Sequence, residues 1–172
     1  MSPFVFSSQR LWFRPFVPED APLIHRLNQD PEVMRYVHEE PFRNEKHALD
    51  FLIAYRYSTD GLGRWALIEQ TTGNWMGWCG LKRHSNGEVD LGFRLLRQYW
   101  GNGFATEAAQ ASLDYGFREK SLPRIIGRVM PSNIASRRVL EKVGMDLVGK
   151  ANVEDLPEAL LYEIHHPAKA NK

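Results

Sequence analysis

Cysteine is nearly absent from the sequence: Cys79 stands alone, so the chain cannot form an internal disulfide. No apolar run is long enough to cross a bilayer, and residues 1–4 lack the basic and apolar pattern of a secretion signal. The formal net charge of +1 argues against the broad basic surface on which nucleic-acid binding usually depends. These absences predict a cytoplasmic protein without membrane or nucleic-acid partners.

The chain also lacks internal repeats, low-complexity segments and any linker rich in proline, glycine and serine. Its 172 residues, 43% of them hydrophobic and 25% charged, have the balance of a folded globular protein and suffice for one core. We therefore expect a single domain over residues 1–172, with its core at about residues 9–165.

Hydrophobic periodicity predicts the secondary structure. Period-two patterns and turn residues predict strands at residues 9–16, 64–69, 75–83, 88–96, 124–130, 145–151 and 159–165. Helical spacing predicts helices at residues 18–37, with a break near Pro31, and at residues 44–57, 102–119 and 132–143. Strands that come first and then alternate with helices indicate an α/β (α+β) fold with a mixed sheet.

Residues 97–108 lie where an expected strand ends and an expected helix begins, and they contain Gly101 and Gly103. Glycines there let the backbone bend tightly, and the free N–H groups at the helix start form a cradle for a diphosphate. The loop lacks the Gly-Lys-Ser/Thr of a P-loop and the third glycine of the dinucleotide fingerprint. A ligand that carries a diphosphate and uses neither motif is coenzyme A. The alternative is a plain strand-to-helix turn.

The spacing Gln98-x-x-Gly101-x-Gly103 resembles the coenzyme A signature of the GNAT acetyltransferases. The preceding Asp-Leu-Gly-Phe at residues 90–93 is similar to the family's fourth strand. Three further stretches resemble the ribosomal-protein N-terminal acetyltransferase (RimJ/RimL-type) branch, namely residues 11–16, residues 31–36 and residues 133–145, where Asn133-x-x-Ser136 precedes Val-Leu-Glu-Lys-Val-Gly-Met. The resemblance covers residues 9–164, and its motifs follow the family's order.

The resemblance implies a mostly antiparallel central sheet, flanked by helices and splayed between the family's fourth and fifth strands, here residues 88–96 and 124–130. Acetyl-CoA would enter this gap, its pantetheine arm pairing with the backbone of Phe93 and Leu95 and bonding the side chain of Asn133. The resemblance also implies a diphosphate site made by the backbone of the glycine loop, namely Gln98, Gly101, Asn102, Gly103, Phe104 and Ala105.

Acyl transfer to an amine makes its own demands, because the amine attacks only when neutral and the departing thiolate needs a donor. The resemblance implies that Ser136 is this donor and also contacts the coenzyme, since the RimJ/RimL-type branch has a serine at this place. In the strand at residues 88–96, Glu88, Asp90 and Arg94 share the face opposite the apolar side chains. We expect Asp90 to act as the base or to steer the amine, with Glu88 as its rival.

No metal is expected, because none of the six histidines has metal-ligand spacing. Cys79 lies in an apolar strand, where free cysteines are usually buried hydrophobes, so no covalent intermediate is expected. Asn133 and Ser136 also suit a helix cap, a role compatible with coenzyme binding.

The sequence therefore predicts an N-acetyltransferase that moves the acetyl group of acetyl-CoA to a primary amine by direct attack. A protein N-terminus, an amino acid and a small amine all stay open as acceptors. Four acidic residues either attract a cationic amine or form solvated surface: Asp30, Glu39, Glu40 and Asp50. The alternative function is a non-catalytic acyl-CoA sensor or interaction module. A homodimer is possible by analogy with the family.

Overall fold

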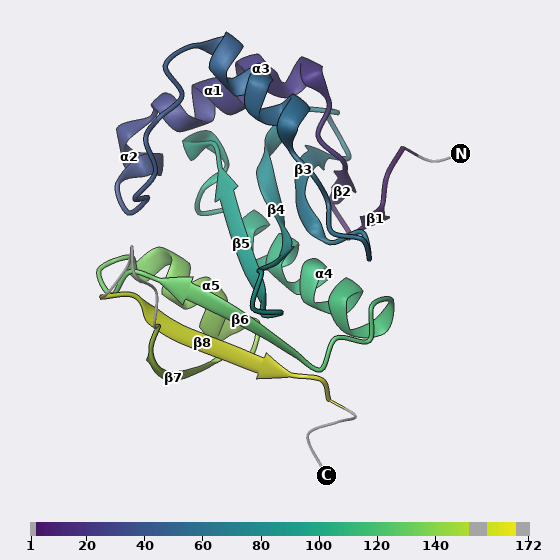
Figure 1. The fold of residues 1–172 in the computed structure, drawn as a ribbon, viewed down its shortest axis with the longest axis vertical. Helices are drawn as coiled ribbons and strands as arrows, with labels where there is room; N and C mark the ends of the chain where they lie inside the picture. Colours follow the sequence, from purple (N-terminus) through teal and green to yellow (C-terminus); the bar gives the residue numbers. More distant parts are fainter. Residues whose placement is uncertain (1–2, 152–157, 168–172) are drawn as a thin grey trace.

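A computed structural model describes residues 3–151 and 158–167 of the protein (Figure 1). Within these residues one sheet of eight strands has the order β1-β2-β3-β4-β5-β6-β8-β7. The strands are β1 (Phe6–Ser7), β2 (Leu11–Arg14), β3 (Gly63–Glu69), β4 (Trp75–Arg83), β5 (Val89–Leu95), β6 (Arg124–Val129), β7 (Asp146–Lys150) and β8 (Leu160–His165). All neighbours are antiparallel except β5 and β6, which are parallel. This mixed, mostly antiparallel sheet confirms the predicted fold class.

Five α-helices accompany the strands in the described part of the chain: α1 (Ala21–Gln29), α2 (Pro31–Met34), α3 (Glu45–Ala54), α4 (Phe104–Arg118) and α5 (Ile134–Lys142). Short 3-10 turns at Pro18–Asp20 and Arg97–Tyr99 precede α1 and the glycine loop. The break between α1 and α2 falls at Asp30, which is extended and whose side chain accepts a hydrogen bond from the N–H of Glu32. None of these helices is long and apolar enough to span a membrane.

The two faces of the sheet bury two separate apolar clusters. Successive side chains of a strand point to opposite faces, so Ala66 belongs to the cluster under α1, α2 and α3, and Leu67 belongs to the cluster under α4 and α5. Helix α4 lies close to the sheet through small residues, and a Cβ added at Gly116 would lie 2.6 Å from the Leu81 Cδ1 atom. Figure 1 shows α1 and α3 across the top of the view and α4 crossing behind the strands.

The sheet is splayed between β5 and β6, which share only the pair Asp90↔Ile126. Two ion pairs tie the closed end, because Glu88 lies 3.3 Å from Arg124 and 3.0 Å from Arg128 of β6. Beyond Ile126 the two strands diverge toward their C-terminal ends. The splay predicted between residues 88–96 and 124–130 is therefore confirmed, and it leaves one backbone edge of β5 without a partner strand.

Most predicted elements are present with shorter bounds. The prediction omitted β1 and the 3-10 turn at Arg97–Tyr99, because segments of two or three residues are too short to show a period. Chain order also does not show that β8 lies between β6 and β7. β7 is thus an edge strand, which explains why its five residues are exposed despite an apolar Leu-Val pair.

Candidate active site

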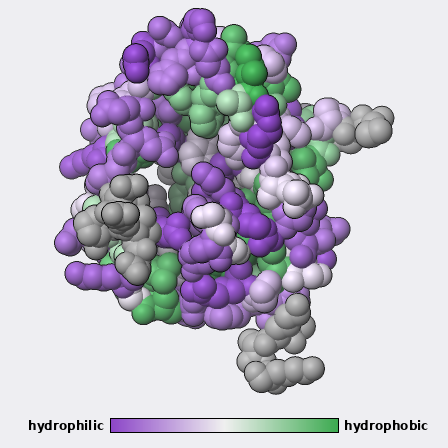
Figure 2. Space-filling view, in the orientation of Figure 1, coloured by the Kyte–Doolittle hydropathy of each residue, from purple (hydrophilic) through white to green (hydrophobic). Residues whose placement is uncertain are grey.

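A cleft of about 540 Å³ opens at the wide end of the splay. Its lining residues come from four segments and fall within residues 32–37, 93–95, 99–106 and 133–142. They come from α2 and the chain after it, the end of β5, the glycine loop with the start of α4, and α5. Figure 2 shows the surface hollowed at the left of the view, between the part formed by the N-terminal helices and the part that contains α5.

The glycine loop opens into this cleft through a bend that requires glycine. Gly101 and Gly103 have φ values of 74° and 78°, in the left-handed region that other residues avoid. In the described part of the chain, the N–H groups of residues 101–106 donate to no acceptor. They gather at the N-terminus of α4, where the helix dipole adds positive potential. The loop therefore fits an anionic diphosphate.

Arg10 braces the loop from the turn between β1 and β2. Its Nε lies 2.6 Å from Glu107 Oε2 in the first turn of α4, and its Nη1 donates to the Asn102 carbonyl oxygen at 3.1 Å. Its guanidinium carbon also lies 4.1 Å from the centre of the Phe104 ring. These contacts fix the bend in place before any ligand binds. No feature of the sequence linked Arg10 to a loop about ninety residues away.

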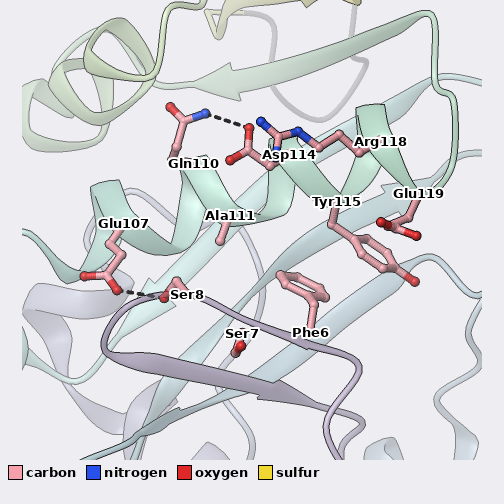
Figure 3. A pocket seen from close by; sticks show the side chains of 10 residues that line it. All are labelled: Phe6, Ser7, Ser8, Glu107, Gln110, Ala111, Asp114, Tyr115, Arg118 and Glu119. Carbon is pink, nitrogen blue, oxygen red and sulfur yellow. Dashed lines mark hydrogen bonds between the residues drawn. The ribbon is translucent and has the colours of Figure 1, made fainter.

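A second cavity of about 400 Å³ lies behind this brace, between β1 and α4 (Figure 3). At its edge the hydroxyl of Ser8 donates to Glu107 Oε1 at 2.7 Å. Phe6 and Tyr115 form the apolar part of its wall and stack on each other. None of the residues predicted to bind or react lines this cavity.

The N-terminus of α5 presents two polar side chains to the cleft. Asn133 Oδ1 accepts a hydrogen bond from the N–H of Ser136 at 3.2 Å, so Asn133 caps the helix as expected. Within the described residues, the Asn133 amide N–H₂ and the Ser136 hydroxyl have no partner, and both residues line the cleft. Capping therefore leaves a donor on each side chain free to meet a ligand.

Asp90 lies outside the cleft lining, in a network under the closed end of the splay. Its carboxylate accepts two hydrogen bonds from Arg64, at 3.0 and 3.1 Å, and lies 2.9 Å from His84 Nε2. Burial by itself raises the pKa of Asp90, but the charge of Arg64 and the hydrogen bond with His84 outweigh it and hold this pKa well below its usual range. Asp90 is therefore ionised and a weak proton acceptor near neutral pH.

Glu88, the rival for the base, lies in the same network. A hydrogen bond from Asn86 and the ion pairs with Arg124 and Arg128 lower the pKa of Glu88 as well. Like Asp90, it is absent from the cleft lining. Neither carboxylate has the raised pKa that a general base near neutral pH usually shows.

Most of the residues predicted to bind the coenzyme gather in the cleft, namely Phe93, Leu95, Gly101, Gly103, Phe104, Ala105, Asn133 and Ser136. Gln98 and Asn102 are exposed and do not line it. Sequence reasoning did not assign a role to several other lining residues: Val33, Tyr36, Arg94, Tyr99, Thr106 and Val139. For Arg94 a signal existed, because it shares a strand face with Asp90 and directly precedes Leu95.

A mixed sheet that splays between two parallel strands, with a helix start suited to an anion at the mouth of the gap, is the arrangement that the resemblance to the GNAT acetyltransferases implied. Residues 10–146 match the family described as "Acetyltransferase (GNAT) domain", and the chain belongs to this GNAT acetyltransferase family.

Two bacterial relatives illustrate the match. The uncharacterized N-acetyltransferase p20 of Bacillus licheniformis is 34% identical over 146 residues, which cover 83% of this chain and 82% of that one. The crystal structure of a GNAT-family acetyltransferase from Bacillus anthracis superposes with a TM-score of 0.81 at 30% identity, and the superposition covers 93% of this chain and 97% of that one.

A spermidine N-acetyltransferase from Vibrio cholerae, solved in complex with CoA and spermine, shares the fold at a TM-score of 0.78 and 20% identity. The aligned region covers 94% of this chain and 99% of that one. The family match, the Bacillus licheniformis relative and the Bacillus anthracis structure identify the protein as an acetyl-CoA-dependent N-acetyltransferase that transfers an acetyl group to an amine. This membership favours an enzyme over the acyl-CoA sensor and over a nucleic-acid-binding domain.

Proposed function

We propose that the cleft at the splay is the active site and that Ser136 and Asn133 act there together with the glycine loop. The observation that carries this proposal is that three sets of donors open into one cleft and have no acceptor within residues 3–151 and 158–167: the N–H groups of the loop, the Asn133 amide and the Ser136 hydroxyl. A diphosphate, a pantetheine amide and a departing thiolate each need such donors.

The unpaired edge of β5 supports the pantetheine assignment. Past the pair Asp90↔Ile126, backbone groups of β5 that face β6 lack a strand partner, while β4 continues to pair with β5 as far as Leu95. Phe93 and Leu95 lie on this stretch and line the cleft. In the proposal their backbone groups bind the amides of the pantetheine arm, as a neighbouring strand would. Gln98 and Asn102 contribute only through their backbone.

Asn133 is proposed to bond the pantetheine arm through its amide N–H₂, and two substitutions separate this role from capping. Asn133→Asp keeps a good cap but loses the donor, so we expect acetyl-CoA affinity to fall about tenfold with the unfolding free energy nearly unchanged. Asn133→Ala removes the cap as well and should cost about 1 kcal/mol of stability. Calorimetric titration and thermal unfolding measure the two effects. If Asn133→Asp binds acetyl-CoA as tightly as wild type does, Asn133 only caps α5 and does not bind the coenzyme.

Asp90 is proposed to serve the proton transfer or to steer the amine from its place outside the cleft lining. Asp90→Asn should lower kcat/KM, because an amide neither accepts a proton nor balances the charge of Arg64. Steady-state rates at neutral pH test this, with Glu88→Gln compared in parallel. A wild-type kcat/KM in Asp90→Asn would exclude Asp90 both as the base and as the group that steers the amine.

The lowered pKa of Asp90 also fixes the sign of its effect on stability. A carboxyl group with a lowered pKa in the folded state adds stability that is present above its unfolded pKa, about 3.9, and is lost as pH falls toward the folded value. The free energy of unfolding of wild type should exceed that of Asp90→Asn by about 2 kcal/mol at neutral pH. Denaturant unfolding should show this difference shrinking in acid.

We also propose that the protein belongs to the RimJ/RimL-type branch, which the stretches at residues 11–16, 31–36 and 133–145 support. In this proposal residues 1–172 form one domain that works in the cytoplasm. A homodimer would cover the exposed edge at β7, where Leu147 and Val148 are half exposed. Light scattering after size-exclusion chromatography measures the oligomeric state.

The direct test is to titrate the purified protein with acetyl-CoA and then to measure thiol release with peptides, amino acids, polyamines and aminoglycosides. We expect acetyl-CoA to bind and one acceptor class to be turned over. The proposed active site is wrong if acetyl-CoA does not bind. It is also wrong if substitutions at Gly103 and Asn133 leave the affinity for acetyl-CoA unchanged.

A further inference from the structure

Arg94 is a cation held in the wall of the cleft with little negative charge around it. Its side chain is only 12% exposed, and its guanidinium packs over the Trp78 indole at 5.1 Å. Its Nη1 donates to Oδ1 of Asn28, a neutral and buried partner, at 2.9 Å. Burial lowers the pKa of Arg94, which shows that the surroundings solvate its charge poorly.

The one carboxylate near Arg94 in the described residues is a weak counter-ion. Glu39 lies 3.4 Å from Arg94 Nη2, but its side chain is 74% exposed, and such pairs contribute little. A buried cation is costly unless an anion or several hydrogen bonds accompany it. An anion that binds from the cleft would therefore stabilise the charge of Arg94.

Two of the four acidic residues that the sequence offered for attracting a cationic amine are engaged elsewhere. Asp30 lies 3.1 Å from Arg97 and caps α2, and Asp50 lies 2.8 Å from Lys46. Among the lining residues, the charged side chains are Glu32, Arg35, Arg94 and Lys142, and Glu32 lies 3.7 Å from Arg35. The balance of charge in the cleft favours an anion over a polycation.

The anion at Arg94 is distinct from the coenzyme's diphosphate because the two sites lie on different faces of β5. Arg94 lies beside Trp78 of the neighbouring strand β4, and both side chains are on the face covered by α1, α2 and α3. Phe93, Leu95 and the start of α4 belong to the opposite face. An acceptor that approaches the splay from the α1 side would pass Arg94, whereas a coenzyme held at the α4 N-terminus would not.

We propose that Arg94 binds a carboxylate of the acceptor, so that the amine acetylated by this enzyme belongs to a molecule that also carries a carboxylate, of which a free amino acid is the simplest. This inference rests on the proposed function and names the substrate class of the same site. A guanidinium has five N–H donors, and Arg94 gives one from Nη1 to Asn28 and one from Nη2 to Glu39. The remaining donors of this planar group, which Trp78 supports, suit the two oxygens of a carboxylate.

The test compares each of a panel of L-amino acids with its carboxamide and its decarboxylated amine, and includes spermidine. Wild type should prefer the acid over both analogues by at least about tenfold in kcat/KM. Arg94→Gln should raise KM for the acids by about 10- to 100-fold, abolish that preference and leave KM for acetyl-CoA unchanged. Arg94→Lys should retain part of the preference. Arg26→Gln, on the exposed side of α1, is the control and should behave as wild type.

A second readout avoids turnover. Binding of N-acetyl amino acids, and of their amides, to the protein loaded with CoA should show the acids binding more tightly in wild type and no difference in Arg94→Gln. Equal use or binding of acids and amides in wild type, a preference for spermidine, or a weakened acetyl-CoA affinity in Arg94→Gln would each overturn the inference. None of those results would contradict the proposed function. The proposed function fails if wild type does not bind acetyl-CoA.

Discussion

Gly103→Val is expected to lower the affinity for acetyl-CoA by at least about 100-fold, because loss of two hydrogen bonds to a charged diphosphate costs about 3 kcal/mol. Gly103 has a φ of 78° immediately before α4, a conformation that valine resists. The strained residue would turn the N–H groups of the loop away from a common centre. Calorimetric titration of acetyl-CoA measures the loss directly.

Gly73→Val is the matched control for this experiment. Gly73 has a φ of 72° in the turn between β3 and β4, outside the cleft lining, and an added Cβ there would meet no atom within 4 Å. It carries the same type of backbone strain and should cost stability without changing coenzyme affinity. If the two variants lose affinity equally, the effect is one of general stability and the diphosphate assignment is wrong.

Ser136→Ala is expected to lower kcat by about 100-fold, the usual scale for loss of a positioned acid, with the dissociation constant of acetyl-CoA nearly unchanged. The reason is that the Ser136 hydroxyl opens into the cleft and has no partner among the residues that the structure describes, so its donor is available to a leaving thiolate. The backbone N–H that bonds Asn133 is kept in the variant. Pre-steady-state thiol release separates the chemical step from binding.

Ser132→Ala provides the comparison, since Ser132 is exposed in the turn just before α5 and absent from the cleft lining. It should retain wild-type turnover. An unchanged kcat in Ser136→Ala would remove the serine from the acid role, and an equal loss of coenzyme affinity and turnover would make it a binding residue instead.

Features that depend on neighbouring residues were predictable from the sequence. Alternation in the strand at residues 88–96 placed Phe93 and Leu95 on one face, and Arg94 on the other, as the structure has them. The two glycines before α4 predicted a tight anion-binding bend, and both have the positive φ that such a bend requires. The cap at Asn133 followed from residue type and position.

Features that depend on distant residues were not predictable. Arg10 reaches Glu107 because α4 lies next to the turn between β1 and β2, and Arg64 reaches Asp90 because β3 and β5 flank β4. Charged residues are common on any surface, so no local pattern distinguishes the ones that form such pairs. This is why Asp90 looked like a free carboxylate in the sequence, whereas Arg64 and His84 hold it in the structure.

The single pair Asp90↔Ile126 has a consequence for how the protein opens under native conditions. β1 to β5 form one continuous antiparallel unit, and β6, β8 and β7 form another, with little backbone bonding between them. Backbone amides of β6 and β8 should therefore exchange with deuterium as a group, at a lower opening free energy than those of β3 and β4. A ligand bound along the edge of β5 would join the two units and slow that exchange. Binding of the acyl donor would therefore couple the local unfolding of one half of the sheet to that of the other.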